Sequence, residues 1–331
     1  MHRGSKPAVV RRNGIELDTG DVPYLLDPAR TVEGAVNVIS HAHSDHLPRG
    51  GRETRVVSTD KTIELASHRT GRRFTGISAP GVSLLGAGHI PGSAMALIED
   101  GKRVLYTGDF CTRRKLYLEP AKPVRTDILI TEATYGRPEY VFPDAVELSG
   151  VIRDWVSDAV SSSIPVFFVV YPLGKAQEIE TVLRGLPLFA DEDVQAHNRL
   201  VFGSCDDWIG SIQEAKDAGS VFICSSRRSL AAVPGAIRRR LLFATVSGWA
   251  VAPGFKNAGG FDEAFPLSDH CDYNDLIDFV RKCNPSHVYT VHGFTESLAA
   301  SIADELGIEA EPLKRHASGR KRGQRRIDTY P

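Results

Sequence analysis

The chain is poor in cysteine, and none of its five cysteines forms a Cys-x-x-Cys pair. An odd set without that spacing argues against a disulfide framework and against a cysteine zinc site, and it is typical of a reducing compartment. The longest apolar run, residues 164–173, is well short of the roughly 20 residues that span a membrane. The N-terminus also lacks the apolar stretch of a signal peptide. We therefore expect a cytoplasmic protein without a membrane segment.

Net charge is almost absent, because 40 Lys and Arg face 41 Asp and Glu. Composition alone therefore indicates no partner. Residues 314–326 differ, with seven basic side chains and no acidic one. A run of this kind binds the phosphates of a nucleic acid or is a solvated tail, and the segment itself leaves both readings open.

The order of apolar runs and turn residues predicts an α/β fold. Residues 35–40 form a predicted buried strand, residues 58–71 a capped helix, and the Asp100-Gly101 pair a hairpin between two strands. From about residue 142 amphipathic helices alternate with buried strands. Several predicted strands end at a histidine or an acid, near His41, Asp109, Glu132 and His292. Loops at one rim of a rigid sheet are where open α/β proteins build their sites.

The densest group of such residues is the segment HAHSDH, which contains three of the chain's 11 histidines. Three imidazoles and a carboxylate this close resist burial unless a cation lies among them, and both are common metal ligands. The alternation predicts one subsite if the segment is extended and two if it turns. Its ligands are His41, His43, Asp45 and His46, and further candidates beside glycines are His89, Asp109 and His292.

Taken singly, His89, Asp109 and His292 are more simply explained as loop, turn and strand-end residues. The HxHxDH segment is different, because three histidines at fixed positions around Asp45 are rare by chance. It makes the metal interpretation of the other three residues stronger.

With these residues the chain resembles the metallo-β-lactamase superfamily, whose signature is HxHxDH on the loop after a strand. Asp27 is similar to the first motif of that family, which supports the metal loop rather than binding metal, and His89 and Asp109 match the third and fourth motifs. Later motifs resemble the β-CASP nuclease branch, with Glu132 in TEATYG and His270 in LSDHCDY. His292 in TVHGFTES resembles the last motif of this branch.

Within that branch, TEATYGRPEYVFP, YPLGKAQEI and VSGWA together look most like the short DNA-ligase-associated exonucleases. Related archaeal proteins are described as RNA 3′-end processing factors. The resemblance implies an αββα sandwich with an inserted α/β cap. About 137 residues separate Glu132 from His270, so the cap is reduced. We expect the sandwich in residues 1–145 and 246–331 and the cap in residues 146–245.

The resemblance also implies two Zn²⁺ ions, or Mn²⁺ in their place. His41, His43 and His89 would hold the first ion and Asp45, His46 and His292 the second, with Asp109 bridging them. Catalytic roles fall to His270 as proton donor, to Glu132 as its orienting partner, and to Asp45. A purely structural Glu132–His270 pair is the alternative. Candidate contacts to substrate phosphates are Ser93, Thr134 and Lys175, although Lys175 also fits an ordinary helix start.

The predicted function is hydrolysis of phosphodiester bonds in single-stranded nucleic acid, as a DNA exonuclease of repair. The alternatives are an RNA-processing endo- or exoribonuclease and a small-molecule hydrolase of the same fold. A nucleic-acid-binding subunit without metal is a third. By analogy with the family, the partners are single-stranded DNA or RNA, and a DNA ligase or helicase. His292 does not separate DNA from RNA, because both kinds of relative carry histidine there.

Overall fold

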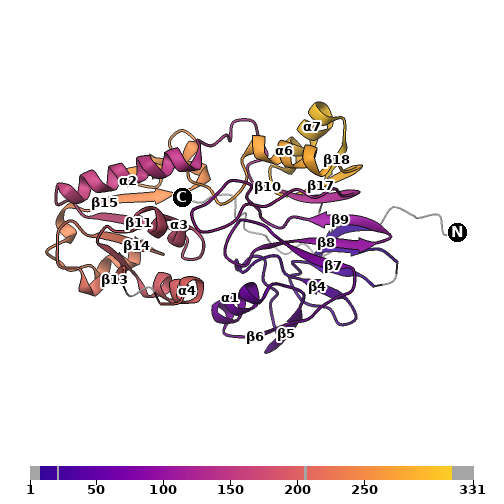
Figure 1. Cartoon of the computed structure of the whole chain (residues 1–331), viewed down its shortest axis with the longest axis horizontal. Helices are drawn as coiled ribbons and strands as arrows, with labels where there is room; N and C mark the ends of the chain where they lie inside the picture. The colour runs from indigo at the N-terminus through magenta and orange to yellow at the C-terminus, as the bar shows by residue number, and fades with distance from the viewer. Residues whose placement is uncertain (1–7, 21, 205–206, 315–331) are drawn as a thin grey trace. The chain divides into compact units, whose positions relative to one another are not determined.

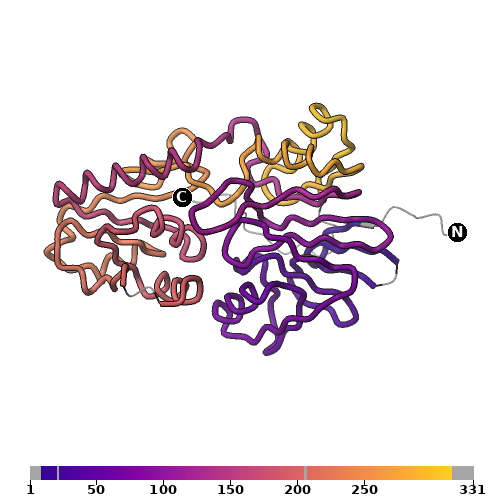
Figure 2. The backbone as a smooth tube through the Cα atoms, in the orientation of Figure 1, coloured from indigo at the N-terminus to yellow at the C-terminus, as the bar shows by residue number. Residues whose placement is uncertain are grey.

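The computed structural model describes residues 8–20, 22–204 and 207–314, and the chain divides into two compact units. The first unit comprises residues 1–112, 120–139 and 270–331, and the second residues 113–119 and 140–269. In Figure 2 the first unit therefore combines the indigo part of the chain with the orange-to-yellow part, residues 270–314. Apart from Lys314, the basic segment 314–326 lies outside the described residues.

The first unit contains two large sheets. One has the order β1-β2-β3-β4, and a bridge between Val38 and Val57 joins it to the pair β5-β6. The other has the order β18-β17-β10-β9-β8-β7. The strands of the first sheet and of the pair are Ala8–Arg12, Gly14–Asp18, Tyr24–Leu26, Val36–Val38, Glu53–Val56 and Arg73–Gly76 (β1 to β6). Those of the second are Val82–Gly86, Ala94–Asp100, Lys102–Tyr106 and Ile128–Ala133 (β7 to β10), with His287–Gly293 and Glu309–Pro312 (β17 and β18).

Along strands β7 to β10 and β17, alternating side chains pack into two different hydrophobic cores. On β9, Val104 and Tyr106 pack with the strands of the first sheet, whereas Leu105 packs with helices. The same alternation along β8 and β10 follows from the two-residue period of a strand. The outer helices are α1 (Asp60–Thr70), α6 (Tyr273–Cys283) and α7 (Thr295–Leu306). Figure 1 shows α6 and α7 on one side of the sheets and α1 on the other, which confirms the predicted αββα sandwich.

Local sequence explains the elements that carry the site. Helix α1 begins after Thr59, whose side chain accepts a hydrogen bond from the Thr62 N–H, and it ends at Gly71 with a φ of 63°. The hairpin between β8 and β9 turns at Gly101, which has a φ of 69°. Strands β9, β10 and β17 are parallel neighbours. Their carboxyl ends therefore meet at one edge of the sheet, as the sequence predicts.

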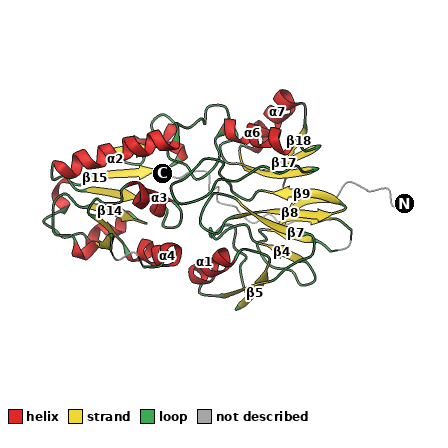
Figure 3. Ribbon diagram, in the orientation of Figure 1, coloured by secondary structure: helices red, strands yellow, loops and turns green. Residues whose placement is uncertain are grey.

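The second unit is built on a parallel sheet of order β13-β12-β14-β11-β15-β16. Phe167 on β11 faces one core and Phe168 the other, so both faces of the sheet are buried. Figure 3 shows helices α2, α3 and α4 around these strands. The strands are Val166–Val169, Leu188–Ala190, Ile209–Ser211, Val221–Cys224, Leu242–Val246 and Glu263–Phe265 (β11 to β16). The helices are Ala145–Ser161, Lys175–Val182, Glu192–Phe202 and Phe255–Ala258 (α2 to α5).

The predicted cap range, residues 146–245, falls within this second unit. The unit is an inserted α/β layer of the kind that the resemblance implies. Among the described residues, no helix combines the length and the apolar content that crossing a membrane requires.

Helix α3 is unusual because it buries polar side chains. Gln177 donates to the Asn198 carbonyl oxygen at 2.7 Å, and the Asn198 amide donates to Glu180 Oε1 at 2.8 Å. Glu180 Oε2 has no hydrogen-bond partner among the described atoms. Burial raises the pKa of Glu180 to about 8 against the hydrogen bond from Asn198, and the charge of Asp191 acts in the same direction as burial.

This burial predicts that Glu180→Gln raises the free energy of unfolding by an amount that grows with pH. The folded-state pKa lies above the unfolded one, so the folded chain keeps a proton that the unfolded chain releases, and the free energy of unfolding falls as the pH rises through this window. Glutamine removes that loss. We expect the free energy of unfolding of the variant, relative to that of wild type, to be higher at pH 8 than at pH 5 by on the order of 3 kcal/mol. Denaturant unfolding at both pH values measures this difference. Glu192→Gln, at an exposed position of α4, is the control. An equal pH dependence of Glu180→Gln and wild type would contradict the assignment.

Candidate metal centre

The HAHSDH loop follows β4 and turns within its own length. The Ile39 N–H donates to the Val57 carbonyl at 3.0 Å, which fixes the end of the strand, and the His46 N–H donates to the His43 carbonyl at 3.1 Å. His41 is fully buried, and His46 is 3% exposed. The loop therefore turns at His43, and the division of its ligands between two metal subsites stays a prediction.

His89 and Asp109 come from two other loops. The Ser93 hydroxyl accepts hydrogen bonds from the His89 and Ile90 N–H groups, both at 3.2 Å, and so shapes the loop between β7 and β8. Asp109 lies just beyond β9. Gly108, with a φ of 54°, stands beside it, and a Cβ there would lie 2.5 Å from the Ser40 Cβ. Only glycine permits this approach of the Asp109 loop to the histidine loop.

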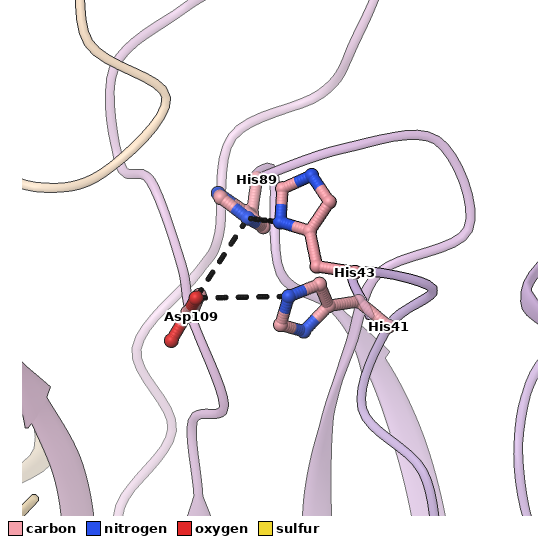
Figure 4. Close-up of side chains that lie close together, drawn as sticks. All are labelled: His41, His43, His89 and Asp109. Carbon is pink, nitrogen blue, oxygen red and sulfur yellow. Dashed lines mark hydrogen bonds and ion pairs between the residues drawn. The ribbon is translucent and has the colours of Figure 1, made fainter. Parts of the chain in front are cut away.

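These loops bring four of the predicted ligands together. One ligand atom from each of His41, His43, His89 and Asp109 lies within 4.8 Å of the others. Asp109 Oδ2 is 3.6 Å from His41 Nε2 and 3.9 Å from His89 Nε2. His89 Nε2 is 3.1 Å from His43 Nδ1. Figure 4 shows the four side chains pointing toward one another.

Asp27 fixes the orientation of two of the imidazoles. Its carboxylate accepts hydrogen bonds from the Ser40 N–H at 2.7 Å, the Ser40 hydroxyl at 2.6 Å and the Tyr106 hydroxyl at 2.8 Å. It also accepts from His46 Nδ1 at 2.7 Å. Since the Ser40 proton goes to Asp27, the Ser40 oxygen accepts from His41 Nδ1 at 2.9 Å. His41 therefore carries its proton on Nδ1 and presents the Nε2 lone pair to the cluster.

The electrostatics of the cluster suit a cation. Burial, reinforced by His46 and His89, holds the pKa of His41 well below its usual value. Burial alone would lower the pKa of His46, but Asp109 and Asp27 outweigh it and raise that pKa to about 10. Burial raises the pKa of Asp109 to about 7, against the charge of His46. Protons and a metal ion compete for these atoms, because a ligand must be deprotonated to bind.

One structural observation, independent of the sequence motif, indicates that these side chains fit a divalent metal. His41 Nε2 is buried and has no hydrogen-bond partner among the described atoms. A buried polar nitrogen without a partner is costly, and a metal ion would satisfy it. Three imidazole nitrogens and one carboxylate oxygen are the donor types and number that zinc takes. A His/Asp metal-binding cluster is thus present.

The second predicted group is less closely assembled. His46 Nε2 is 3.5 Å from Asp109 Oδ2 and 3.8 Å from Asp45 Oδ2, and the side chain of Asp45 is 75% exposed. The His46 and His292 ring centroids are 5.3 Å apart. Within the described residues, Asp45 and His292 belong to no group of three ligand atoms as tight as the first.

Glu132 and His270 form the predicted pair. His270 Nδ1 lies 2.8 Å from Glu132 Oε2, and Glu132 Oε1 accepts from the Phe110 N–H at 2.8 Å. Burial opposes the charged form of Glu132, but His270 and these hydrogen bonds hold its pKa below the usual value. The His270 ring lies beside His89, with centroids 4.5 Å apart. The pair therefore adjoins the His/Asp cluster.

A β-bulge sets where His292 lies relative to Glu132. In the β10–β17 pair, Glu132 is opposite Val291 and Ala133 is opposite Gly293, so His292 is the extra residue. It has a φ of 56°. A Cβ on Gly293 would lie 2.2 Å from the Ala133 carbonyl oxygen, so glycine is required there. Bulges re-aim a side chain beside a site, and this one turns His292 out of the regular strand alternation.

The three predicted substrate contacts already have partners within the protein. Ser93 shapes the His89 loop, and the Thr134 hydroxyl donates to Glu132 Oε2. Lys175 lies in the second unit, where its buried ammonium is 3.1 Å from Asp269 Oδ1 and donates to the Leu267 carbonyl at 2.9 Å. Their contact with substrate stays a prediction.

Two residues of the site escaped the sequence reasoning. The Ser40 hydroxyl connects Asp27 to His41, because it donates to the Asp27 carboxylate and accepts from His41 Nδ1. The Tyr106 hydroxyl donates to the same carboxylate from the other sheet. The sequence offered a signal for Ser40, because it directly precedes the first histidine. Tyr106 ends a predicted strand two residues before Gly108, but its reach to Asp27 depends on the packing of the two sheets.

Known proteins show related sequences. Residues 263–311, which include His270 and His292, match the family described as a Zn-dependent metallo-hydrolase RNA specificity domain. A protein named “Probable DNA ligase” from Opitutus terrae is 35% identical over 294 residues, covering 82% of this chain and 28% of that protein. An “RNase J-like protein” from Methanocaldococcus jannaschii is 27% identical over 239 residues, covering 59% of this chain and 55% of that protein.

The “Cleavage and polyadenylation specificity factor 73” of Drosophila melanogaster is 25% identical over 276 residues, covering 62% of this chain and 39% of that protein. The chain spans between about a quarter and about half of the length of these three curated relatives. A solved protein of unknown function from Enterococcus faecalis V583 aligns with a TM-score of 0.57 at 12% identity, over 93% of this chain and 96% of that chain. At this identity the likeness shows the fold alone.

The Asp27 contacts predict that Asp27→Asn weakens metal binding. An asparagine has the same shape, but its amide nitrogen cannot accept from Ser40 or His46, so both imidazoles lose their fixed tautomers. We expect zinc affinity to fall by about 10- to 100-fold, measured by competition with a chelating dye. Asp127→Asn is the control, because the Asp127 carboxylate also accepts a backbone N–H, from Arg103 at 2.8 Å, on the exposed surface of the same unit. Equal affinity in the two variants would refute the role of Asp27.

Proposed function

We propose that this chain, which belongs to the β-CASP branch of the metallo-β-lactamase superfamily, is a metal-dependent nuclease that hydrolyses phosphodiester bonds in single-stranded nucleic acid. The observation that carries the proposal is the Glu132–His270 pair beside the His/Asp cluster. His270 Nδ1 is 2.8 Å from Glu132, and the His270 ring contacts that of His89. A metal site with an adjoining acid–base pair has the parts needed for hydrolysis of a phosphodiester.

In this proposal His41, His43 and His89 hold one divalent cation and Asp45, His46 and His292 a second, with Asp109 shared between them. Zinc is the expected metal, with manganese as the alternative. The donor nitrogens and the shared carboxylate support the first group directly, since they lie within 4.8 Å of one another. When bound, the cations supply Lewis-acid activation of water and of the phosphoryl oxygens.

The chain's own groups then manage protons and orientation. Glu132 accepts a hydrogen bond from the Nδ1–H of His270 and so favours the imidazolium form. The Nε2–H of that ring would then give its proton to the leaving ester oxygen as the bond from this oxygen to phosphorus breaks. Phe110 and Thr134 hold Glu132 through its two oxygens. Asp45, whose side chain is exposed beside His46, is the ligand with the best access to substrate. The first unit, residues 1–112, 120–139 and 270–331, would carry the chemistry, and the second unit would correspond to the cap.

DNA is the substrate we favour, with a role in repair. Support comes from the relative named as a probable DNA ligase. Of the three relatives reported above, it has the highest identity and its match covers the largest share of this chain. On this proposal, a DNA ligase or helicase is the partner class. RNA processing is the second candidate, supported by the match of residues 263–311 to a domain named for RNA specificity and by the RNase J-like relative.

A small-molecule hydrolase of the same fold is disfavoured by the second unit. An inserted six-stranded α/β layer, together with the Glu132–His270 pair, serves a macromolecular substrate better than a small ester. Ser93 and Thr134 remain candidate phosphate contacts near the cluster. Their hydroxyls would have to serve substrate in addition to the backbone and Glu132 contacts described above.

The test is digestion of single-stranded DNA and RNA, each labelled at either end, with zinc or manganese added. The labelled end that disappears first gives the polarity, and internal fragments indicate endonuclease cleavage. We expect cleavage by wild type and a loss of more than about 100-fold in His43→Ala, because a metal ligand contributes at least as much as the groups that orient it.

His68→Ala, an exposed histidine of α1, is the matched control and should cut like wild type. A His43→Ala protein that is folded and cuts as fast as His68→Ala would overturn the proposal. So would wild type that cuts neither polymer with either metal.

A further inference from the structure

We infer that Lys175 is a positioning residue for His270, holding the segment from which that histidine emerges. The inference rests on the function proposed above, in which His270 protonates the leaving oxygen. It changes the interpretation of Lys175 from a substrate contact to a residue that acts through the protein.

The first step is the contact itself. The Lys175 ammonium donates to the Leu267 carbonyl at 2.9 Å and lies 3.1 Å from Asp269 Oδ1. The side chains of Lys175 and Asp269 are only 8% and 10% exposed. Glu178 Oε2 lies 4.0 Å from the same ammonium and is also buried. A buried ion pair of this kind fixes geometry, because separating its members leaves a charge uncompensated.

The second step is where that segment leads. Residues 267–269 directly precede His270, and the chain passes from the second unit into the first between Asp269 and His270. Beyond it, the Cys271 N–H donates to the Phe110 carbonyl at 3.0 Å, and Asp272 caps helix α6. Lys175 therefore contacts the residues that directly precede His270 in the chain, and the first unit contacts the residue that follows it.

Lys175 lies at the start of helix α3, which has a further contact with the rest of the second unit. It is the first residue of α3, and the Gly174 carbonyl before it accepts from the Tyr117 hydroxyl at 2.8 Å. Tyr117 belongs to residues 113–119, the part of the second unit that follows the Asp109 loop in the chain. The start of α3 thus contacts two segments, one that directly precedes His270 and one that follows Asp109 along the chain. Displacements of about 1 Å at a reacting group can cost about 100-fold in rate.

The proposed step makes this role separable from others. The attacking water loses a proton to solvent and its oxygen forms the new bond to phosphorus. The bond from phosphorus to the ester oxygen breaks, and His270 gives that oxygen a proton, which it regains from solvent. A nucleic acid needs this proton because its leaving alkoxide is strongly basic. Bis(p-nitrophenyl) phosphate does not, because p-nitrophenolate is a weak base and leaves unprotonated.

The experiment compares wild type, Lys175→Met, Lys175→Arg and the control Lys216→Met, an exposed lysine of the second unit. The substrates are the labelled strand that wild type cuts and bis(p-nitrophenyl) phosphate. We expect Lys175→Met to lower kcat on the strand by about 10- to 100-fold, within the range of a lost general acid, with the nitrophenyl rate unchanged. Lys175→Arg should recover most of the loss, and Lys216→Met should match wild type.

A double variant adds the decisive comparison. If Lys175 acts through His270, His270→Ala with Lys175→Met cuts the strand no more slowly than His270→Ala alone. A phosphate contact would instead raise KM and add its loss to that of His270→Ala. General destabilisation would lower the rates on both substrates equally. Either of these results, or an unchanged kcat in Lys175→Met, overturns the inference.

A second variant and a structural readout decide the case where Lys175→Met fails to fold or wild type fails to cut. Asp269→Asn keeps the shape of the ion-pair partner, and we expect it to lower kcat in the same substrate-dependent way. In the zinc-loaded protein with ¹⁵N-labelled histidine, the Nδ1–H signal of His270 should shift in Asp269→Asn and not in Lys216→Met. An unmoved signal refutes the positioning role. Wild type that cuts neither substrate refutes the proposed function alone, since the spectrum still tests the position of His270.

Discussion

The carboxylate of Asp27 is the interaction on which the rest of the site depends. It accepts hydrogen bonds from Ser40, His46 and Tyr106, and through the Ser40 hydroxyl it fixes His41 as well. Tyr106 reaches it from the second sheet, so one buried group ties the histidine loop to both layers of the sandwich. Without an acceptor there, no hydrogen bond would hold the Nδ1 atoms of His41 and His46 so that their Nε2 atoms face the cluster. The arrangement is an outer support that sets tautomer and ring direction for the inner ligands.

The remaining features place charge around that point and control the backbone that carries it. Glycine at 108 lets the Asp109 loop approach Ser40 closely, and the bulge at His292 turns that side chain out of the strand alternation. Burying imidazoles and a carboxylate costs desolvation free energy, which destabilises the fold. A bound cation offsets this cost by interacting with them. The Glu132–His270 pair then stands at the edge of the cluster. The chain passes from the second unit into the first next to His270.

Local rules were enough to predict much of this from sequence. The capped helix after the histidine loop and the hairpin at Asp100-Gly101 follow from capping and turn chemistry. The grouping of His41, His43, His89 and Asp109 is implied by the resemblance to the superfamily. What could not be predicted depends on distances between elements far apart in the chain. The reach of Tyr106 to Asp27, the extra residue at His292 and the burial of the Lys175 ammonium beside Asp269 all arise from packing. A lysine at a helix start looks solvated in sequence, and only the fold shows that the segment before His270 covers it.

The proposed function depends most directly on a metal held by this cluster, and X-ray absorption at the zinc edge of the purified zinc-loaded protein tests for it. It predicts a first shell of nitrogen and oxygen at about 2.0–2.1 Å, with the outer-shell scattering that imidazole rings produce and no sulfur, since the described cysteines lie outside the cluster. A sulfur shell, a spectrum without imidazole scattering, or protein that retains no zinc would contradict it.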